Sequence, residues 1–115
     1  MVDVPVERFE ELVADALDGI PDDLWRLTDN LAVVVQEGSD RSTLLGLYDG
    51  IPLTQRDAAY DGMVVPDRIS IFRRPILAMC DDEAEVVEQV RITVIHEVAH
   101  HFGIDDDRLH ELGWA

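Results

Sequence analysis

Residues 96 to 106 read His-Glu-Val-Ala-His-His-Phe-Gly-Ile-Asp-Asp and follow the pattern HExxHxxGxxD. His96 and His100 stand four residues apart, so on a helix both imidazoles lie on one face and can hold a single metal ion. Glu97 lies about 100° round the helix from His96, which places its carboxylate beside such an ion rather than on it. Two histidines with a carboxylate next to the first are the ligands and the general base expected of a hydrolytic zinc site.

The glycine and the acidic residues after the histidines predict a third ligand. Gly103 tolerates the left-handed conformation that ends a helix and redirects the chain. Asp106 follows three residues later and is the best candidate, with Asp105 and Asp107 as rivals that the spacing does not separate. His110 is a fourth candidate, either as a ligand or as a donor to the transition state. A tetrahedral ion with three protein ligands keeps its fourth position for water, as catalytic zinc sites do.

Such a site predicts hydrolysis by metal-activated water. Zinc lowers the pKa of its bound water to about 7 and polarises the carbonyl under attack, and Glu97 is placed to take a proton from that water and pass it to a leaving amine. The alternative is that His96 and His100 are core histidines of a buried helix, but an uncompensated Glu97 on that helix would be costly. His101 points about 100° away from His100, so we expect it to support the ligands or form hydrogen bonds.

The helix that carries the motif is expected to begin at Asp82 and to run to about Phe102. Asp82 and Glu85 have the form of a capping box with aspartate in the capping place. The expected buried side consists of β-branched residues, namely Val87, Val90, Val94, Ile95 and Val98. Because β-branched residues lower helix propensity, this helix needs tertiary burial to be stable.

Hydrophobic periodicity predicts the other elements, which are helices over residues 3–17, 22–27 and 107–112 and strands over residues 31–36, 43–48 and 68–73. We expect the first two strands to pair as an antiparallel hairpin. Residues 68–73 alternate between polar and apolar, which indicates a half-exposed strand at a sheet edge, ended by Pro75. Residues 53–66 look irregular. The sequence therefore predicts an α+β fold with a small mixed or antiparallel sheet, in one domain over residues 1–115.

Composition narrows the classes of function. The 115 residues include 25 acidic and 9 basic ones, all arginine, for a net charge of −16. A surface this acidic repels nucleic acids and anionic membranes, so neither is expected as a partner. No secretory signal and no apolar run of about 18 residues is visible, which predicts a soluble cytoplasmic protein. Cys80 is the only cysteine, so no disulfide is expected, and its apolar surroundings indicate a half-buried, inert thiol.

The stretch from Val94 to Asp106, with Arg108 to Gly113 after it, resembles the zincin metallopeptidases of the HExxHxxGxxD type, whose third ligand is aspartate. Within these it looks like the small bacterial group called minimal zincins. Residues Asp67 to Pro75 are similar to the strand before the active helix in that group, so the resemblance covers about the C-terminal half. It implies a zincin-like α+β fold in which zinc is held by His96, His100 and Asp106, with Glu97 as the catalytic base.

The resemblance implies a zinc-dependent metallopeptidase that acts on peptide or protein substrates. It also implies that the strand near residues 68–72 lies along the cleft, where an extended peptide adds to it. Donors to the transition state are expected from His110, or from Arg73, Arg74 or Tyr60 on the other side of the site.

Two other functions are compatible with the motif. Nine residues follow Asp106, whereas larger zincins have a second subdomain at that point. This difference favours the first alternative, a non-catalytic or partner-dependent zincin scaffold that completes its cleft with a second subunit. The second alternative is a metal-dependent nuclease, because small bacterial ribonucleases place histidines as HxxxHxxxxxH. Here the last of those positions is Asp106, and the charge of −16 opposes a polyanionic substrate.

Overall fold

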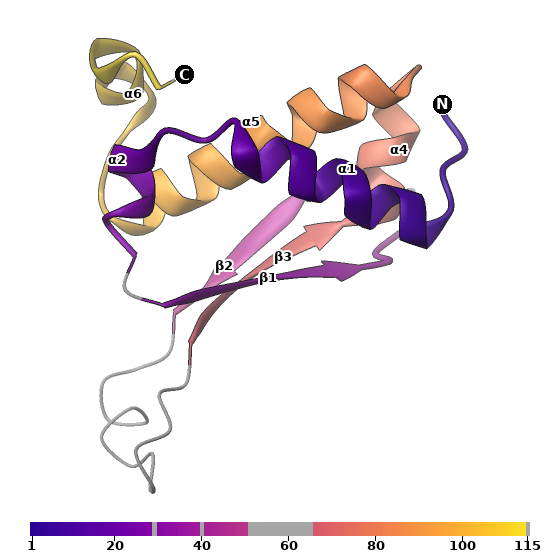
Figure 1. Cartoon of the computed structure of the whole chain (residues 1–115), viewed down its shortest axis with the longest axis horizontal. Coiled ribbons are helices and arrows are strands. Elements are labelled where there is room, and N and C mark those ends of the chain that lie inside the picture. Colours follow the sequence, from indigo (N-terminus) through magenta and orange to yellow (C-terminus); the bar gives the residue numbers. More distant parts are fainter. Residues whose placement is uncertain (29, 40, 51–65, 115) are drawn as a thin grey trace, which may run out of the picture.

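The computed structural model describes residues 1–28, 30–39, 41–50 and 66–114. In these residues a layer of helices covers one face of a small sheet (Figure 1). The elements are α1 (Val6–Asp18), α2 (Asp22–Trp25), β1 (Leu31–Gln36), β2 (Gly46–Asp49), β3 (Asp67–Phe72), α4 (Arg73–Met79), α5 (Glu83–His101) and α6 (Asp106–Leu112). The expected α+β class is confirmed. The stretch expected to be irregular, residues 53–66, lies outside the described residues except for its last position.

The sheet has the order β1-β3-β2, with β1 parallel and β2 antiparallel to β3. The expected hairpin between residues 31–36 and 43–48 is therefore wrong, because β3 lies between those strands. The expected edge position of residues 68–73 is wrong for the same reason. Ile69 and Ile71 are fully buried, and a strand this apolar gains most from the central place, where neighbours cover both of its edges.

The chain passes directly from β3 into α4, a helix that the sequence did not predict. Pro75 was expected only to end the strand, but it lies in the first turn of α4, where its missing N–H removes no helical hydrogen bond. The next two residues, Ile76 and Leu77, are buried in the core. Cys80 follows α4 and is fully buried rather than half-buried, and that burial raises the pKa of its thiol, which makes it a poor nucleophile.

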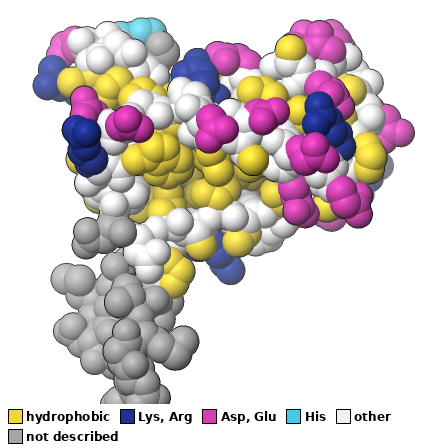
Figure 2. Space-filling model, in the orientation of Figure 1, with side chains coloured by type: hydrophobic (Ala, Val, Ile, Leu, Met, Phe, Trp, Pro, Cys, Tyr) yellow, Lys and Arg dark blue, Asp and Glu magenta, His cyan; other side chains and the backbone are white. Residues whose placement is uncertain are grey.

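Most acidic residues of the described part of the chain lie on the surface, as Figure 2 shows for one face of the molecule. Among the described residues, the fully buried polar ones are Ser70 and Thr93, so no carboxylate is fully buried there. The Ser70 hydroxyl accepts a hydrogen bond of 3.0 Å from Nε2 of Gln36, which satisfies its polarity inside the sheet. None of the described helices is long and apolar enough to cross a bilayer.

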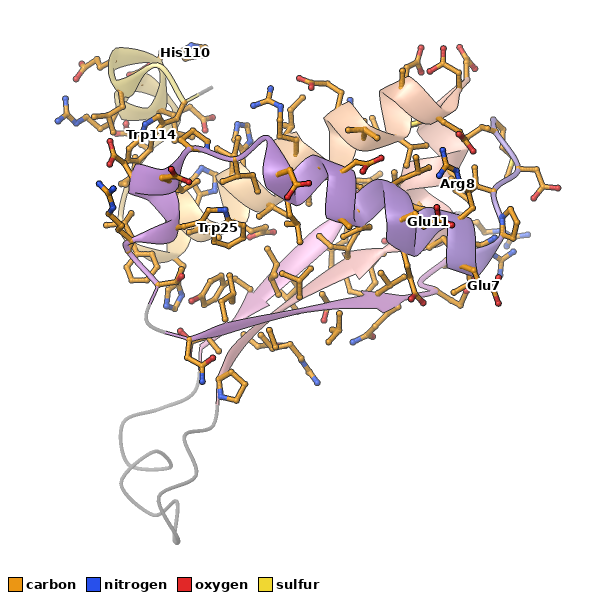
Figure 3. All side chains as sticks on the ribbon, in the orientation of Figure 1. Glu7, Arg8, Glu11, Trp25, His110 and Trp114 are labelled. Carbon is orange, nitrogen blue, oxygen red and sulfur yellow. The ribbon has the colours of Figure 1, made fainter. Side chains whose placement is uncertain are left out.

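Helix α5 begins where the capping pattern predicted. The Asp82 carboxylate accepts the backbone N–H of Glu85 at 2.8 Å. The first residue of α5, Glu83, is tied to α1 by Arg8, whose Nη2 lies 2.9 Å from its carboxylate; Figure 3 shows Arg8 and Glu11 on α1. The hydrogen bond from Arg8 holds the pKa of Glu83 below its usual range. An exposed pair of this kind adds little stability, but it helps to set the orientation of two helices.

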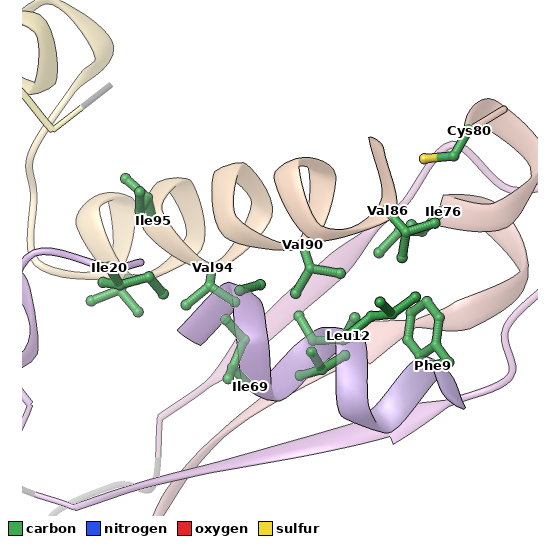
Figure 4. Packing of buried hydrophobic residues seen from close by; sticks show 14 of the residues in the cluster. Phe9, Leu12, Ile20, Ile69, Ile76, Cys80, Val86, Val90, Val94 and Ile95 are labelled. Carbon is green, nitrogen blue, oxygen red and sulfur yellow. The ribbon is translucent and has the colours of Figure 1, made fainter. Parts of the chain in front are cut away.

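The core of the molecule forms around α5. Its fully buried valines are spaced by four residues and make one continuous face, formed by Val86, Val90, Val94 and Val98. Figure 4 shows valines of this face in one cluster with Phe9 and Leu12 of α1 and Ile69 of β3. Val87 was expected on the buried side but is only partly buried, because Val86 occupies that face. The other expected positions are buried.

Gly46 marks a close approach of β2 to α5. A Cβ atom at this position would lie 2.6 Å from Cγ2 of Thr93 and 3.1 Å from the carbonyl oxygen of Ser70. We expect Gly46→Ala to lower the free energy of unfolding by about 1–3 kcal/mol, the usual cost of overpacking, as measured by urea denaturation. Thr93→Ser removes the clashing methyl group, so Gly46→Ala should cost clearly less in the Thr93→Ser background. An equal loss in both backgrounds would contradict the close approach.

Candidate metal centre

The two histidines of the motif lie on one side of a groove with a volume of about 270 Å³. The ring centroids of His96 and His100 are 5.8 Å apart and the rings are tilted by 33°. The opposite wall is the segment that leads into β2, residues 43–46. From α5 the groove is lined by Gln89, Ile92, Thr93, His96, Glu97 and His100.

The wall opposite the histidines differs from the one expected. The strand near residues 68–72 was expected along the cleft, but it is the central strand, and residues 43–46 line the groove instead. These residues could not be recognised from the sequence, because they were expected in a hairpin with residues 31–36. Gln89 and Thr93 were also missed, although they stand seven and three residues before His96 and therefore share its helix face.

The end of α5 turns the chain back toward the histidines. Gly103 has a φ of 78°, in the left-handed region. The N–H of Ile104 donates to the carbonyl oxygen of Ala99 at 2.8 Å, and the N–H of Gly103 donates to that of His100 at 3.1 Å. These two bonds form a Schellman motif, which satisfies the last carbonyl groups of the helix. The predicted stop at Gly103 is confirmed, and its backbone conformation explains why glycine stands there.

After this turn, Asp106 is the acidic residue that reaches an imidazole. Its Oδ1 lies 3.2 Å from Nε2 of His100. The rival Asp105 caps α6 instead, since its carboxylate accepts the N–H of Arg108 at 2.9 Å. Asp106 and Asp107 follow it in the first turn of α6. The structure therefore brings His100 and Asp106 together from two different helices.

Glu97 lines the same groove and is half-buried. Burial raises the pKa of its carboxyl group above the usual range, and the nearby His100 and His96 oppose that rise. Partial removal from water favours the protonated form of a carboxylic acid. A carboxylate with a raised pKa is a better proton acceptor, which is the property needed for a general base.

The other candidate site residues lie outside this groove. His101 stacks on the ring of Tyr48, with centroids 3.9 Å apart and an interplanar angle of 18°, so it packs against β2. His110 is exposed on α6 (Figure 3). Arg73 donates to the carbonyl oxygen of Val4 and pairs with Glu37 at 2.8 Å. None of these three is among the described residues that line the groove.

Two more residues, Arg74 and Tyr60, were expected as donors to the transition state. Arg74 lies beside Arg73 in a separate pocket with residues 1–3. Tyr60 falls outside the described residues.

The sequence profile of the zincin-like metallopeptidases matches residues 27–114, a range that contains every residue of the groove. The chain belongs to the zincin-like metallopeptidases. This confirms the resemblance inferred from the motif. The matched range begins after α1 and α2 and contains the three strands, α4, α5 and α6 of this zincin-like protein.

A solved structure shares the fold of this chain. A conserved hypothetical protein from Thermus thermophilus is similar over 86% of this chain and 94% of its own, with a TM-score of 0.54 and 22% sequence identity. An identity this low shows a shared fold only. No curated protein matches this zincin-like chain.

The donor atoms of this zincin-like site suit zinc. Zinc takes imidazole nitrogen and carboxylate oxygen at about 2.0–2.2 Å, so two ligand atoms of one tetrahedral ion stand about 3.3 Å apart. Nε2 of His100 and Oδ1 of Asp106 lie at a hydrogen-bond distance of 3.2 Å, which is close to that ligand spacing, and His96 lies one helical turn away on the same face. Among the described residues, no three His, Cys, Asp or Glu side chains form a closed cluster. A three-ligand site therefore requires the side chains of His96, His100 and Asp106 to move closer together than they lie here.

Gly103 offers a test of the turn that positions Asp106. A Cβ at this position would meet no atom within 4 Å, so the cost of Gly103→Ala is purely conformational. We expect it to lower the free energy of unfolding by about 1–2 kcal/mol, the cost of the left-handed conformation for a residue with a Cβ. Gly103→Asn is the matched control and should cost less, because asparagine tolerates this conformation. Wild-type stability of Gly103→Ala in urea denaturation would rule out the turn as described.

Proposed function

We propose that this protein is a zinc-dependent metallopeptidase in which His96, His100 and Asp106 hold the metal. The observation that carries the proposal is the 3.2 Å approach of the Asp106 carboxylate to the His100 imidazole. This contact brings together donor atoms from two helices, and their distance is close to that between two ligand atoms of one zinc ion. Of the two rival aspartates, Asp105 is engaged as a helix cap, and Asp107 is tested by the control variant below.

Glu97 acts as the general base in this proposal. It follows His96 directly and lines the same groove, so it accepts a proton from the attacking water and then delivers it to the leaving amine. A bound zinc ion supplies Lewis acidity, which makes water a nucleophile near neutral pH and polarises the peptide carbonyl. His96, His100 and Asp106 hold that ion, and His101 stays against Tyr48, outside the ligand set.

The groove favours an extended peptide as substrate. One wall is a short stretch of chain with the apolar side chains of Leu44 and Leu45, and the other is the face of α5 with Ile92. The net charge of −16 favours neutral or basic peptides over polyanions and disfavours the nuclease alternative. We place the activity in the cytoplasm, with which the buried free thiol of Cys80 is compatible.

Zinc titration tests the ligand set. We expect the wild type to bind one ion per chain, measured by calorimetry and metal analysis. Structural zinc sites bind with about 10–16 kcal/mol, which is about 3 kcal/mol for each of four ligands. Loss of one ligand should therefore weaken binding by about 100-fold in His100→Ala and in Asp106→Asn. The matched control is Asp107→Asn, which removes the same charge at the neighbouring residue and should bind zinc like the wild type. Weakened zinc binding by Asp107→Asn, with normal binding by Asp106→Asn, would make Asp107 the third ligand.

Substitution of the proposed base tests catalysis separately from binding. We expect Glu97→Gln to keep its zinc and to hydrolyse a mixed peptide library about 10²–10⁴-fold more slowly than the wild type, because general base catalysis contributes about that factor. Mass spectrometry of the library with and without a chelator measures both effects. Hydrolysis by Glu97→Gln at the rate of the wild type would exclude this base. A zinc-loaded wild type that cleaves only within a native complex would favour the partner-dependent scaffold.

A further inference from the structure

A second groove lies at the sheet edge opposite β2, between α1 and β1. Its volume is about 420 Å³. It is lined by Glu10, Val13, Ala14 and Leu17 from α1 and by Val33, Val34 and Val35 from β1. Figure 2 shows hydrophobic side chains gathered between these two elements, below a row of acidic ones. The groove keeps α1 apart from β1, so Leu17, Val33 and Val35 are only partly buried.

The outer edge of β1 has backbone groups directed into this space. In the part of the chain that the structure describes, β1 pairs on one side only, with β3. The carbonyl oxygen of Asn30 accepts the N–H of Asp67 at 3.0 Å. Because backbone groups of alternate residues point to opposite sides of a strand, those of Val34 face β3 and those of Val33 and Val35 face outward. An open edge of this kind is a template for another strand.

The rim of the groove is acidic. Helix α1 carries five acidic residues and one basic residue, Arg8. Arg8 is bound to Glu11 and Glu83, so its charge is already compensated. Glu10 lines the groove and is exposed. A segment that enters the groove therefore meets negative charge along α1 and apolar side chains below it.

We propose that this groove binds an extended segment of another protein that has alternating apolar side chains and flanking basic residues. The segment adds as a strand to the outer edge of β1, with backbone hydrogen bonds to Val33 and Val35. Its apolar side chains cover Leu17, Val33 and Val35, which are only partly buried, and a lysine or arginine lies beside Glu10. A second copy of this chain is a poor occupant, because each copy carries a net charge of −16. The site lies at the opposite sheet edge from the metal centre and does not depend on the proposed hydrolysis.

The test uses a synthetic peptide of alternating valine and threonine with lysines at both ends, and the same peptide with glutamates in place of the lysines. The full chain carries Glu97→Gln, so that hydrolysis of the peptide does not remove it. Titration followed by nuclear magnetic resonance should show saturable binding of the lysine peptide. The amide signals of Val33 and Val35 should shift, and their hydrogen exchange should slow. The glutamate peptide should bind far more weakly.

Charge reversal at the rim supplies the matched pair of variants. Glu10→Arg should weaken binding of the lysine peptide by at least about fivefold, because it replaces an attraction with a repulsion worth about 1 kcal/mol or more. Asp15→Arg makes the same change at an exposed position of α1 outside the groove and should alter the affinity less than about twofold. Both positions are exposed, so both variants should unfold at the temperature of the parent chain.

Four results would overturn the proposal. The first is a lack of saturable binding, and the second is an equal effect of Glu10→Arg and Asp15→Arg, which would show general charge attraction. The third is a shift of the amides of residues 43–46 in place of those of Val33 and Val35, which would move the peptide to the groove of the candidate metal centre. The fourth is concentration-dependent self-association that protects Val33 and Val35, which would make a second copy the occupant.

Discussion

Burial of the valine face of α5 determines where the two histidines of the candidate metal centre can lie. Val94 and Val98 are fully buried against α1 and the sheet. Because β-branched residues are weak helix formers, the helix depends on that packing. His96 and His100 each follow one of these valines by two residues, about 200° round the helix. Once the valines are inside, both imidazoles must face outward into the groove formed with residues 43–46.

The third donor depends on a different constraint, the way in which α5 ends. The left-handed Gly103 and the bond from Ile104 to Ala99 reverse the chain within one turn. Asp105 then caps α6, and this cap fixes the start of the helix and with it the direction of the Asp106 side chain. The site thus combines two histidines on α5, a helix packed into the core, with an aspartate on α6. Helix α6 is short, and its buried residue is Leu109.

The parts of the molecule that the sequence predicted are those specified by neighbouring residues. The cap at Asp82, the stop at Gly103 and the shared face of His96 and His100 all depend on interactions within one or two helical turns. Strand order could not be predicted in this way, because the place of β3 between β1 and β2 follows from burial summed over the whole sheet. The groove wall at residues 43–46 depends on that order and was missed with it. The choice between Asp105 and Asp106 needed the cap geometry of α6.

The chain between His100 and Asp106 has only five residues, two of them in the Schellman turn. The entropy lost on closing a loop grows with its length, so a ring this small closes at little cost. A cation bound by both side chains would therefore cross-link α5 and α6. The C-terminal helix, which has few apolar anchors of its own, would then gain resistance to fraying from the same ion that the proposed hydrolysis requires.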